Sequence, residues 1–294
     1  MSLKMVVFDL DGVLVDIDSS WQFIHRAFGT DNEWNFQRHL RGEINFKEFM
    51  RSDISMWDKP KIECIKSILD QAPIMASASN MIDELKKDGY KTAIISSGIS
   101  LLANRIKKTL NLDYSYANIL LADKDGRLTG EGEEVVGLLS KGAMLSKLAG
   151  ETGISTRQCA VFGDSRFDVP LFKEAGLSIA FNAKDEAVAK AADLVLDNKD
   201  MCKALPWLQS KDLVKAEASL EYGSVREAMA MASSVSPDNS RVPSGLQVRT
   251  WCEEKRVNVK IVCAKGVKTA LATFDDVLAC MQAADRAVEA AKPR

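Results

Sequence analysis

Apolar residues form two kinds of block along the first two thirds of the chain. Continuous apolar runs with many β-branched side chains are typical of strands buried in a parallel sheet, and they cover residues 4–15, 91–95, 158–162, 177–180 and 193–196. Between these runs, apolar residues recur at helical spacing over residues 79–87, 100–110, 141–149, 169–174 and 185–191. This alternation of strand and helix predicts a doubly wound α/β sheet.

Two insertions interrupt the alternation. Residues 16–75 are rich in helix formers and aromatic side chains and are too long for a strand-to-helix loop. We expect a small helical cap here, lying over the ends of the strands. Residues 117–136 hold two short extended runs around Asp125 and Gly126, a pattern that predicts a β-hairpin.

The pattern changes past residue 210. Residues 216–222, 247–253 and 256–263 read as strands, whereas residues 224–234 and 274–291 have helical periodicity. A polar stretch at residues 236–245 is expected to connect a helix to a strand. The sequence therefore predicts a first domain over residues 1–210 and a second, small α+β domain of βαββα order over residues 211–294.

Composition and charge exclude several classes of protein. The 294 residues carry 39 basic and 41 acidic side chains and are 46% hydrophobic, which is typical of a soluble globular protein. No apolar run approaches the ~20 residues of a membrane helix. The second domain has a net charge of +2 and the first of −4, so neither is expected to bind nucleic acid strongly. The six cysteines form no CxxC pair, which indicates buried free thiols in a reducing cytoplasm.

Acidic side chains follow two of the predicted strands. Asp9 and Asp11 end the first strand, and side chains two positions apart in an extended segment point the same way. Two such carboxylates repel each other unless a cation binds them or one is protonated. Asp164 and Asp168 follow the strand at residues 158–162 and add oxygen ligands for a hard divalent ion such as Mg²⁺.

Anion-binding groups accompany these acids. Ser96 and Ser97 precede Gly98 and a predicted helix, so a hydroxyl and backbone N–H groups are available at a helix N-terminus. Lys141 opens a further helix and supplies a cation. Acidic residues, a metal, a serine-rich turn and a lysine at strand ends together indicate a phosphoryl-transfer site.

Four short strings, in the order FDLDG, ISSG, SKG and GDSRFD, resemble the four motifs of the haloacid dehalogenase superfamily of phosphohydrolases. The likeness to the phosphoserine phosphatase branch extends from residue 4 to about 206. It implies a Rossmann-like fold in which Asp9 is the nucleophile that forms an aspartyl-phosphate. It also implies that Asp11 protonates the leaving oxygen and then activates water.

The resemblance also implies a ligand set. Mg²⁺ would be held by the Asp9 carboxylate, the Asp11 carbonyl and Asp164, with Asp168 acting through water or orienting Lys141. Ser96, the Ser97 N–H group and Lys141 would hold the phosphate oxygens. Two alternatives stay open, since Asp168 can instead cap the helix that begins near residue 169, and the cap aromatics can form core rather than surround substrate.

The cap departs from the phosphoserine phosphatase pattern. That branch binds the serine ammonium with a glutamate and the carboxylate with an arginine, and the corresponding positions here are Asp18 and Asp53. An acid cannot clamp a carboxylate, so phosphoserine would bind poorly unless Arg51 substitutes. Phe167 also stands where the branch has an asparagine. We therefore hypothesise a phosphatase of small phosphomonoesters whose substrate need not be phosphoserine.

The second domain resembles the small, dimer-forming Pcc subunit of the KEOPS tRNA-modifying complex over about residues 215–291. The run SPDN, the strands LQVRTW and VNVKIVC and the segment TFDDVLACMQAA carry this likeness. It implies a homodimer or a docking surface, although the domain can also serve only to cover a sheet edge. A scaffold in a tRNA-modifying assembly is thus the alternative to an enzyme. We favour the enzyme because all four motifs keep the residues that the chemistry needs.

Overall fold

The computed structural model describes residues 2–239 and 242–290. The chain separates into two compact units, one spanning Leu3–Lys203 and one containing the residues from Ala204 onward. The structural division thus lies a few residues before the predicted boundary at residue 210, because the short helix α10 (Leu205–Leu208) groups with the second unit. None of the helices in the described ranges has the length and apolar character needed to cross a membrane.

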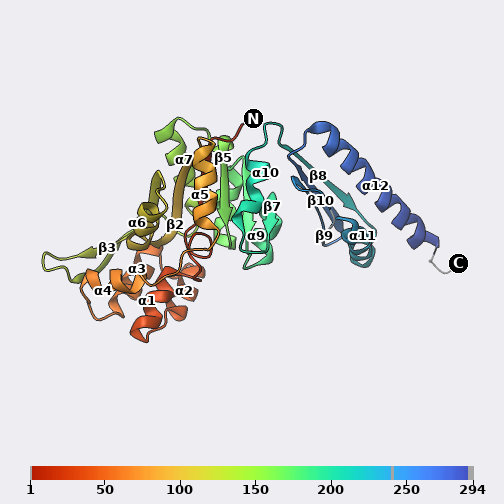
Figure 1. Ribbon diagram of the computed structural model, residues 1–294. Helices are drawn as coiled ribbons and strands as arrows, with labels where there is room; N and C mark the ends of the chain where they lie inside the picture. The colour runs from red at the N-terminus through yellow and green to blue at the C-terminus, as the bar shows by residue number, and fades with distance from the viewer. Residues whose placement is uncertain (1, 240–241, 291–294) are drawn as a thin grey trace. The chain divides into compact units, whose positions relative to one another are not determined.

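A seven-stranded sheet organises the first unit, in the order β4-β3-β2-β1-β5-β6-β7 (Figure 1). All neighbouring strands are parallel except β3 and β4, which form the predicted hairpin. This confirms the doubly wound α/β fold. The strands are β1 (Met5–Phe8), β2 (Lys91–Ile99), β3 (Tyr114–Ala122), β4 (Leu128–Glu133), β5 (Cys159–Gly163), β6 (Leu177–Phe181) and β7 (Leu194–Leu196).

Helices connect the parallel strands. β1, β5 and β6 are buried along their whole length, as continuous apolar runs in a parallel sheet require. Met5 and Val7 of β1 share one core cluster with Leu145 and Leu148 of α7. The helices are α5 (Ala78–Lys87), α6 (Ser100–Thr109), α7 (Lys141–Thr152), α8 (Val169–Glu174) and α9 (Glu186–Ala191), with short 3₁₀ turns η1 (Thr156–Gln158), η2 (Arg166–Asp168) and η3 (Met201–Ala204).

The insertion after β1 forms the expected helical cap. Its helices are α1 (Ser20–Phe28), α2 (Glu33–Leu40), α3 (Phe46–Ser55) and α4 (Ile62–Leu69). Local sequence sets their ends, since the Ser19 side chain accepts from Gln22 N–H at the start of α1, and Asn45 forms a capping box with Glu48 at the start of α3. Stacking of Trp57 on Trp21, with ring centroids 5.9 Å apart, forms part of the core of the cap.

The hairpin strand β4 packs against α3 of the cap. Its turn runs through Asp125 and Gly126, where Gly126 adopts a positive φ of 77°. β3 is longer than predicted, because it starts at Tyr114 and pairs with β2 before it enters the hairpin. The hairpin is therefore continuous with the main sheet.

The second unit contains a three-stranded antiparallel sheet in the order β8-β10-β9, with two long helices. Its elements confirm the predicted βαββα order and are β8 (Val214–Glu221), α11 (Val225–Asn239), β9 (Leu246–Glu253), β10 (Arg256–Cys263) and α12 (Val267–Ala290). Apolar side chains of both helices and all three strands share one core, in which Val259 and Ile261 of the central strand are fully buried.

Two helix boundaries in the second unit were predicted wrongly. α11 continues to Asn239, through a segment whose Ser, Pro, Asp and Asn residues predicted an irregular connection. α12 begins at Val267, seven residues before the predicted start. Gly266 stands before this helix with a φ of 86°, and its carbonyl accepts from Ala270 N–H in the first turn. All six cysteines are free, as predicted, but only Cys159 and Cys263 are buried. Cys64 is exposed, and the other three are half-buried.

Candidate active site

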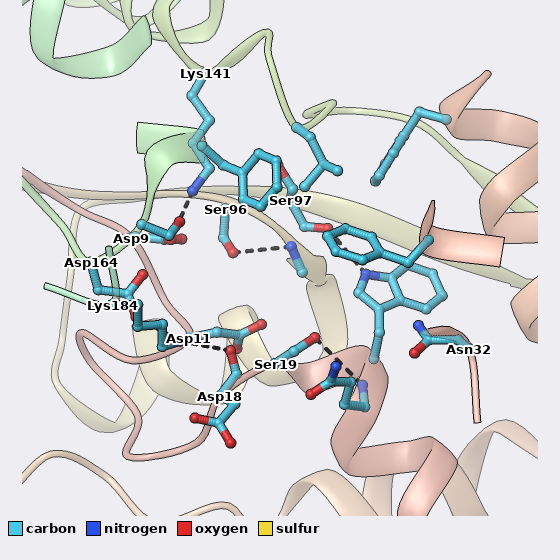
Figure 2. A pocket seen from close by; sticks show the side chains of 18 of the residues that line it. Asp9, Asp11, Asp18, Ser19, Asn32, Ser96, Ser97, Lys141, Asp164 and Lys184 are labelled. Carbon is cyan, nitrogen blue, oxygen red and sulfur yellow. Dashed lines mark hydrogen bonds and ion pairs between the residues drawn. The ribbon is translucent and has the colours of Figure 1, made fainter. Parts of the chain in front are cut away.

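A pocket of about 340 Å³ opens at the carboxyl ends of the central strands, beneath the cap (Figure 2). The strand order β2-β1-β5-β6 places the ends of four strands side by side, so residues distant in sequence meet there. The pocket is lined by Asp9, Asp11, Asp18, Ser19, Trp21, Gln22, Asn32, Phe36, Phe46, Phe49, Ser96, Ser97, Gly98, Leu138, Lys141, Asp164, Ser165, Phe167 and Lys184.

Lys141 lies between two buried carboxylates. Its Nζ donates to Asp9 Oδ2 at 2.7 Å and to Asp168 Oδ1 at 2.6 Å. The second oxygen of Asp168 accepts from the backbone N–H groups of Asp164 and Ser165. Its side chain does not cap α8, so the alternative of a simple helix cap is wrong. Asp168 instead holds both Lys141 and the loop after β5.

Asp9, Asp164 and Asp168 each offer one carboxylate oxygen within 4.8 Å of the others. Lys184 Nζ contacts Asp164 Oδ2 at 2.7 Å and also donates to the backbone carbonyl of Asp18 at 2.9 Å. Gly12 permits this packing, because a Cβ there would overlap Asp164 Oδ2 and its φ is 79°.

These side chains fit a divalent cation. Three carboxylates, those of Asp9, Asp164 and Asp168, contact two lysines, so the ionised cluster has one negative charge more than Lys141 and Lys184 balance. Carboxylate oxygens at this spacing are the ligands that hard divalent ions prefer.

The Asp11 carboxylate points away from this cluster, toward the cap. Its Oδ2 accepts from both N–H and Oγ of Ser20, each at 2.8 Å. The prediction that Asp9 and Asp11 point the same way is wrong, because β1 ends at Phe8 and the chain turns through Leu10 before it reaches Asp11. The turn separates the two carboxylates, while both still line the pocket.

Ser96, Ser97 and Gly98 lie in the last part of β2, which continues to Ile99, and not in a turn as predicted. Register between β2 and β3 shifts over Ile95–Ile99, and this irregularity exposes the segment to the pocket. Ser96 Oγ accepts from Gly98 N–H at 3.0 Å, whereas Ser97 Oγ is buried without a partner.

Burial and charge shift the pKa values of these groups. Burial raises the pKa of Asp11, an effect that the two hydrogen bonds from Ser20 only partly oppose. Burial also raises the pKa of Asp164 to about 8, with Asp9 and Asp168 adding repulsion against the attraction of Lys184. Burial alone would lower the pKa of Lys141, but Asp168 and Asp9 outweigh it and raise that pKa, so Lys141 is an ammonium ion.

The three cap residues singled out in the sequence lie in different places. Asp18 lines the pocket, although its exposed carboxylate also lies 3.5 Å from Arg26. Arg51 does not reach the pocket, because its guanidinium pairs with Glu131 of the hairpin at 2.7 Å. Asp53 is fully buried inside the cap. Arg51 therefore does not replace the missing carboxylate clamp.

Sequence reasoning missed several residues that shape the site. Lys184 was detectable, since it follows β6 and so stands at the same sheet edge as Asp164. Ser20 and Asn118 carried no motif. Asn118 is fully buried and binds Ser97 O and Val136 O through its amide nitrogen, which ties the end of β2 to the segment after the hairpin.

The sequence profile of the haloacid dehalogenase-like hydrolases matches residues 3–176. The chain therefore belongs to this family of hydrolases, as its motifs predicted.

Within the family, the chain is similar to phosphoserine phosphatases. It is 34% identical over 209 residues to the phosphoserine phosphatase of Methanocaldococcus jannaschii, covering 70% of this chain and 98% of that protein. It is 30% identical to the phosphoserine phosphatase of Idiomarina loihiensis, and this match covers 73% of this chain and 97% of that protein. The protein is thus a phosphatase of phosphoserine phosphatase-like type.

Solved structures agree with this assignment. A phospho-aspartyl intermediate analogue of phosphoserine phosphatase superposes with a TM-score of 0.62 at 33% identity, covering 71% of this chain and all of that one. A substrate-bound phosphoserine phosphatase complex superposes with a TM-score of 0.62 at 32% identity, and the match covers 71% of this chain and 99% of that one. The likeness of the second domain to Pcc finds no support in these comparisons and stays a prediction.

Proposed function

We propose that the protein hydrolyses small phosphomonoesters with Mg²⁺ through an aspartyl-phosphate on Asp9. The observation that carries this proposal is the buried contact of Lys141 with both Asp9 and Asp168, beside the carboxylate cluster. Lys141 orients the Asp9 carboxylate and offers positive charge where phosphate oxygens would gather. The solved phospho-aspartyl analogue of a similar phosphatase supports the choice of nucleophile.

The reaction has two steps that share these residues. An Asp9 oxygen attacks phosphorus, the bond from phosphorus to the leaving oxygen breaks, and that oxygen takes the electron pair and a proton from Asp11. Water then attacks the aspartyl-phosphate, gives a proton to Asp11, and releases inorganic phosphate and free Asp9. The raised pKa of Asp11 and its position on the cap side of the pocket both suit an acid that meets the leaving group.

The phosphate oxygens would be held by Lys141, by the hydroxyl of Ser96 and by backbone N–H at Ser97. The unpartnered Ser97 Oγ is a further donor beside them. Asp9, Asp164 and the Asp11 carbonyl would hold Mg²⁺, with Asp168 orienting Lys141. When bound, Mg²⁺ supplies positive charge that stabilises the charge on the transferring phosphoryl group.

Hydrolysis of p-nitrophenyl phosphate with and without Mg²⁺ tests this proposal. The wild-type chain should show metal-dependent turnover, and Asp9→Asn should abolish it because an amide is not a nucleophile. Asp125→Asn is the matched control, since Asp125 lies exposed in the hairpin turn. Turnover by Asp9→Asn equal to that of wild type would refute the assignment of the nucleophile.

We also propose that the second domain, residues 211–294, forms a homodimer and that the protein works in the cytoplasm. Among the described residues, β8 and β9 are edge strands of a three-stranded sheet, and edge strands are common sites of pairing between chains. Light scattering after size-exclusion chromatography of the full chain tests the dimer, and a monomer at micromolar concentration would contradict it. Nothing favours the scaffold role, which explains none of the pocket.

A further inference from the structure

The cap wall of the pocket has no cation among its described lining residues to pair with a second anion. Among the described residues that line the pocket, the cations are Lys141 and Lys184. Both contact carboxylates at the strand ends, at distances of 2.6 to 2.7 Å. The polar residues on the cap side are Asp18, Ser19, Gln22 and Asn32. A leaving group that carries a carboxylate would therefore meet no positive charge there.

Asp53 fixes the direction of one of these polar groups. It is fully buried, and its Oδ2 accepts from Asn32 Nδ2 at 2.7 Å. His25 Nε2 lies 3.3 Å from the same oxygen. On the other side of the ring, His25 Nδ1 lies 2.7 Å from Thr30 Oγ1 and 3.2 Å from Trp57 Nε1. Asn32 Nδ2 thus donates a hydrogen bond to the Asp53 carboxylate, and the His25 ring lies beside the same oxygen.

This contact turns the Asn32 carbonyl into an acceptor for the pocket. A carboxylate only accepts, so the nitrogen of the Asn32 amide must face Asp53. Its Oδ1 then receives no hydrogen bond from the described residues. Asn32 is only 5% exposed but lines the pocket, and Figure 2 shows its amide directed into it. The Asn32 oxygen is thus an acceptor at the pocket surface that a donor on the substrate can reach.

Aromatic rings from the cap, together with Phe167 from η2, form much of the remaining pocket surface. Trp21, Phe36, Phe46, Phe49 and Phe167 line the pocket. Aromatic faces attract cations and cover methylene groups, whereas they offer a carboxylate nothing. An ammonium group therefore matches both the rings and the free Asn32 oxygen.

We propose that the substrate is the phosphate ester of an amino alcohol that has no carboxylate. Asn32 Oδ1 would accept from the ammonium group, and Asp53 is the positioning residue that holds the Asn32 amide in this direction. The proposal rests on the phosphatase function proposed above and specifies its substrate. The buried acid at position 53 thus selects for an amine where related phosphatases are expected to select for a carboxylate.

Values of kcat/KM for a matched series of esters test the proposal. O-Phosphoethanolamine has the amine alone, ethyl phosphate has neither group, and L-phosphoserine has amine and carboxylate. We expect O-phosphoethanolamine to exceed each of the other two by about 10-fold or more, the range of one charge-assisted hydrogen bond. Preference for L-phosphoserine, or equal values for ethyl phosphate and O-phosphoethanolamine, would overturn the proposal.

Variants connect the preference to the residues. Asn32→Leu and Asp53→Asn should both bring the ratio of O-phosphoethanolamine to ethyl phosphate close to one, since an amide at position 53 no longer fixes the direction of Asn32. The ratio is measured within one preparation, so a fall in folded fraction does not change it. Asn35→Leu is the control, because Asn35 lies on α2, the helix that begins directly after Asn32, and does not line the pocket.

The failure of this proposal is distinguishable from failure of the phosphatase function. Metal-dependent hydrolysis of p-nitrophenyl phosphate without any amine preference overturns only the substrate class. An Asn32→Leu variant that keeps the wild-type ratio does the same. Absence of all turnover by the wild-type chain overturns both.

Discussion

Replacing Gly98 with alanine tests the role of Asp11 without touching Asp11 itself. A Cβ at position 98 would lie 2.6 Å from Ser20 Oγ and 2.9 Å from Asp11 Oδ2, which is about 0.8 and 0.5 Å short of the 3.4 Å at which ordinary contact begins. The φ of Gly98 is not positive, so the alanine backbone is not strained. The new methyl group must therefore push Ser20 and the Asp11 carboxylate out of their present positions, whereas Ser96 Oγ, at 3.2 Å, is pressed less closely.

A misplaced general acid lowers the rate most for poor leaving groups. We expect Gly98→Ala to lower kcat/KM for ethyl phosphate by about 100-fold, or about 2.7 kcal/mol, which is typical for displacement of a catalytic group by up to 1 Å. The loss for p-nitrophenyl phosphate should stay below about 10-fold, because p-nitrophenolate leaves without a proton.

The ratio of the two losses is the decisive measurement. Gly150→Ala is the control, since Gly150 lies exposed in α7 with no atom within 4 Å of the added Cβ. It should leave both rates unchanged and stabilise the helix slightly. Equal losses for both esters in Gly98→Ala, or no loss for ethyl phosphate, would refute the assignment of Asp11 as the acid.

Three further predictions concern stability. Lys141→Met should lower the unfolding free energy by about 3–5 kcal/mol in denaturant titrations, because Asp9 and Asp168 lose their buried counter-charge; an unchanged midpoint would contradict this. Burial raises the pKa of Asp164 to about 8 when no metal is bound, so the folded state holds the Asp164 proton more tightly than the unfolded state does. This adds to the unfolding free energy below pH ~4, and the contribution is lost as the pH rises toward 8. In EDTA the melting temperature should therefore fall more between pH 5 and 8 for wild type than for Asp164→Asn, and Mg²⁺ should restore it most at pH 8; parallel pH curves would be evidence against the shift. Ile261→Ala should destabilise the second unit by about 2–5 kcal/mol, since it leaves a cavity in the core between the sheet and its helices, and a melting temperature equal to wild type would count against that core.

The strand pattern carried most of the sequence prediction. β1 and β5 are buried on both faces, so each is a continuous apolar run that sequence alone identifies. The carboxyl ends of parallel strands meet at one edge of the sheet, and this rule predicts that Asp9 and Asp164 lie together, as they do. The rule depends only on where a residue stands along its strand, so it predicts the positions of these acids without any information about the cap.

The directions of the acidic side chains could not be predicted, because they depend on tertiary contacts that the hydrophobic pattern of the sequence does not encode. Asp11 turns toward Ser20 because the chain bends directly after β1, and the partner comes from the cap. The resemblance to phosphoserine phosphatases placed Asp53 in the cap. The direction of its carboxylate depends on the buried neighbours His25 and Asn32. Arg51 stands two residues before Asp53, but its guanidinium pairs with Glu131 on the hairpin.

Several hydrogen bonds join the cap to the sheet, and one of them makes the position of the cap observable in solution. Trp21 Nε1 donates to Ser97 O at 3.1 Å, and the indole is only 5% exposed. Any lifting of the cap away from the sheet must break this bond and bring the ring into water. Intrinsic fluorescence of Trp21 should therefore shift to longer wavelength when the enzyme opens to exchange product for substrate, which gives a label-free signal for turnover dynamics.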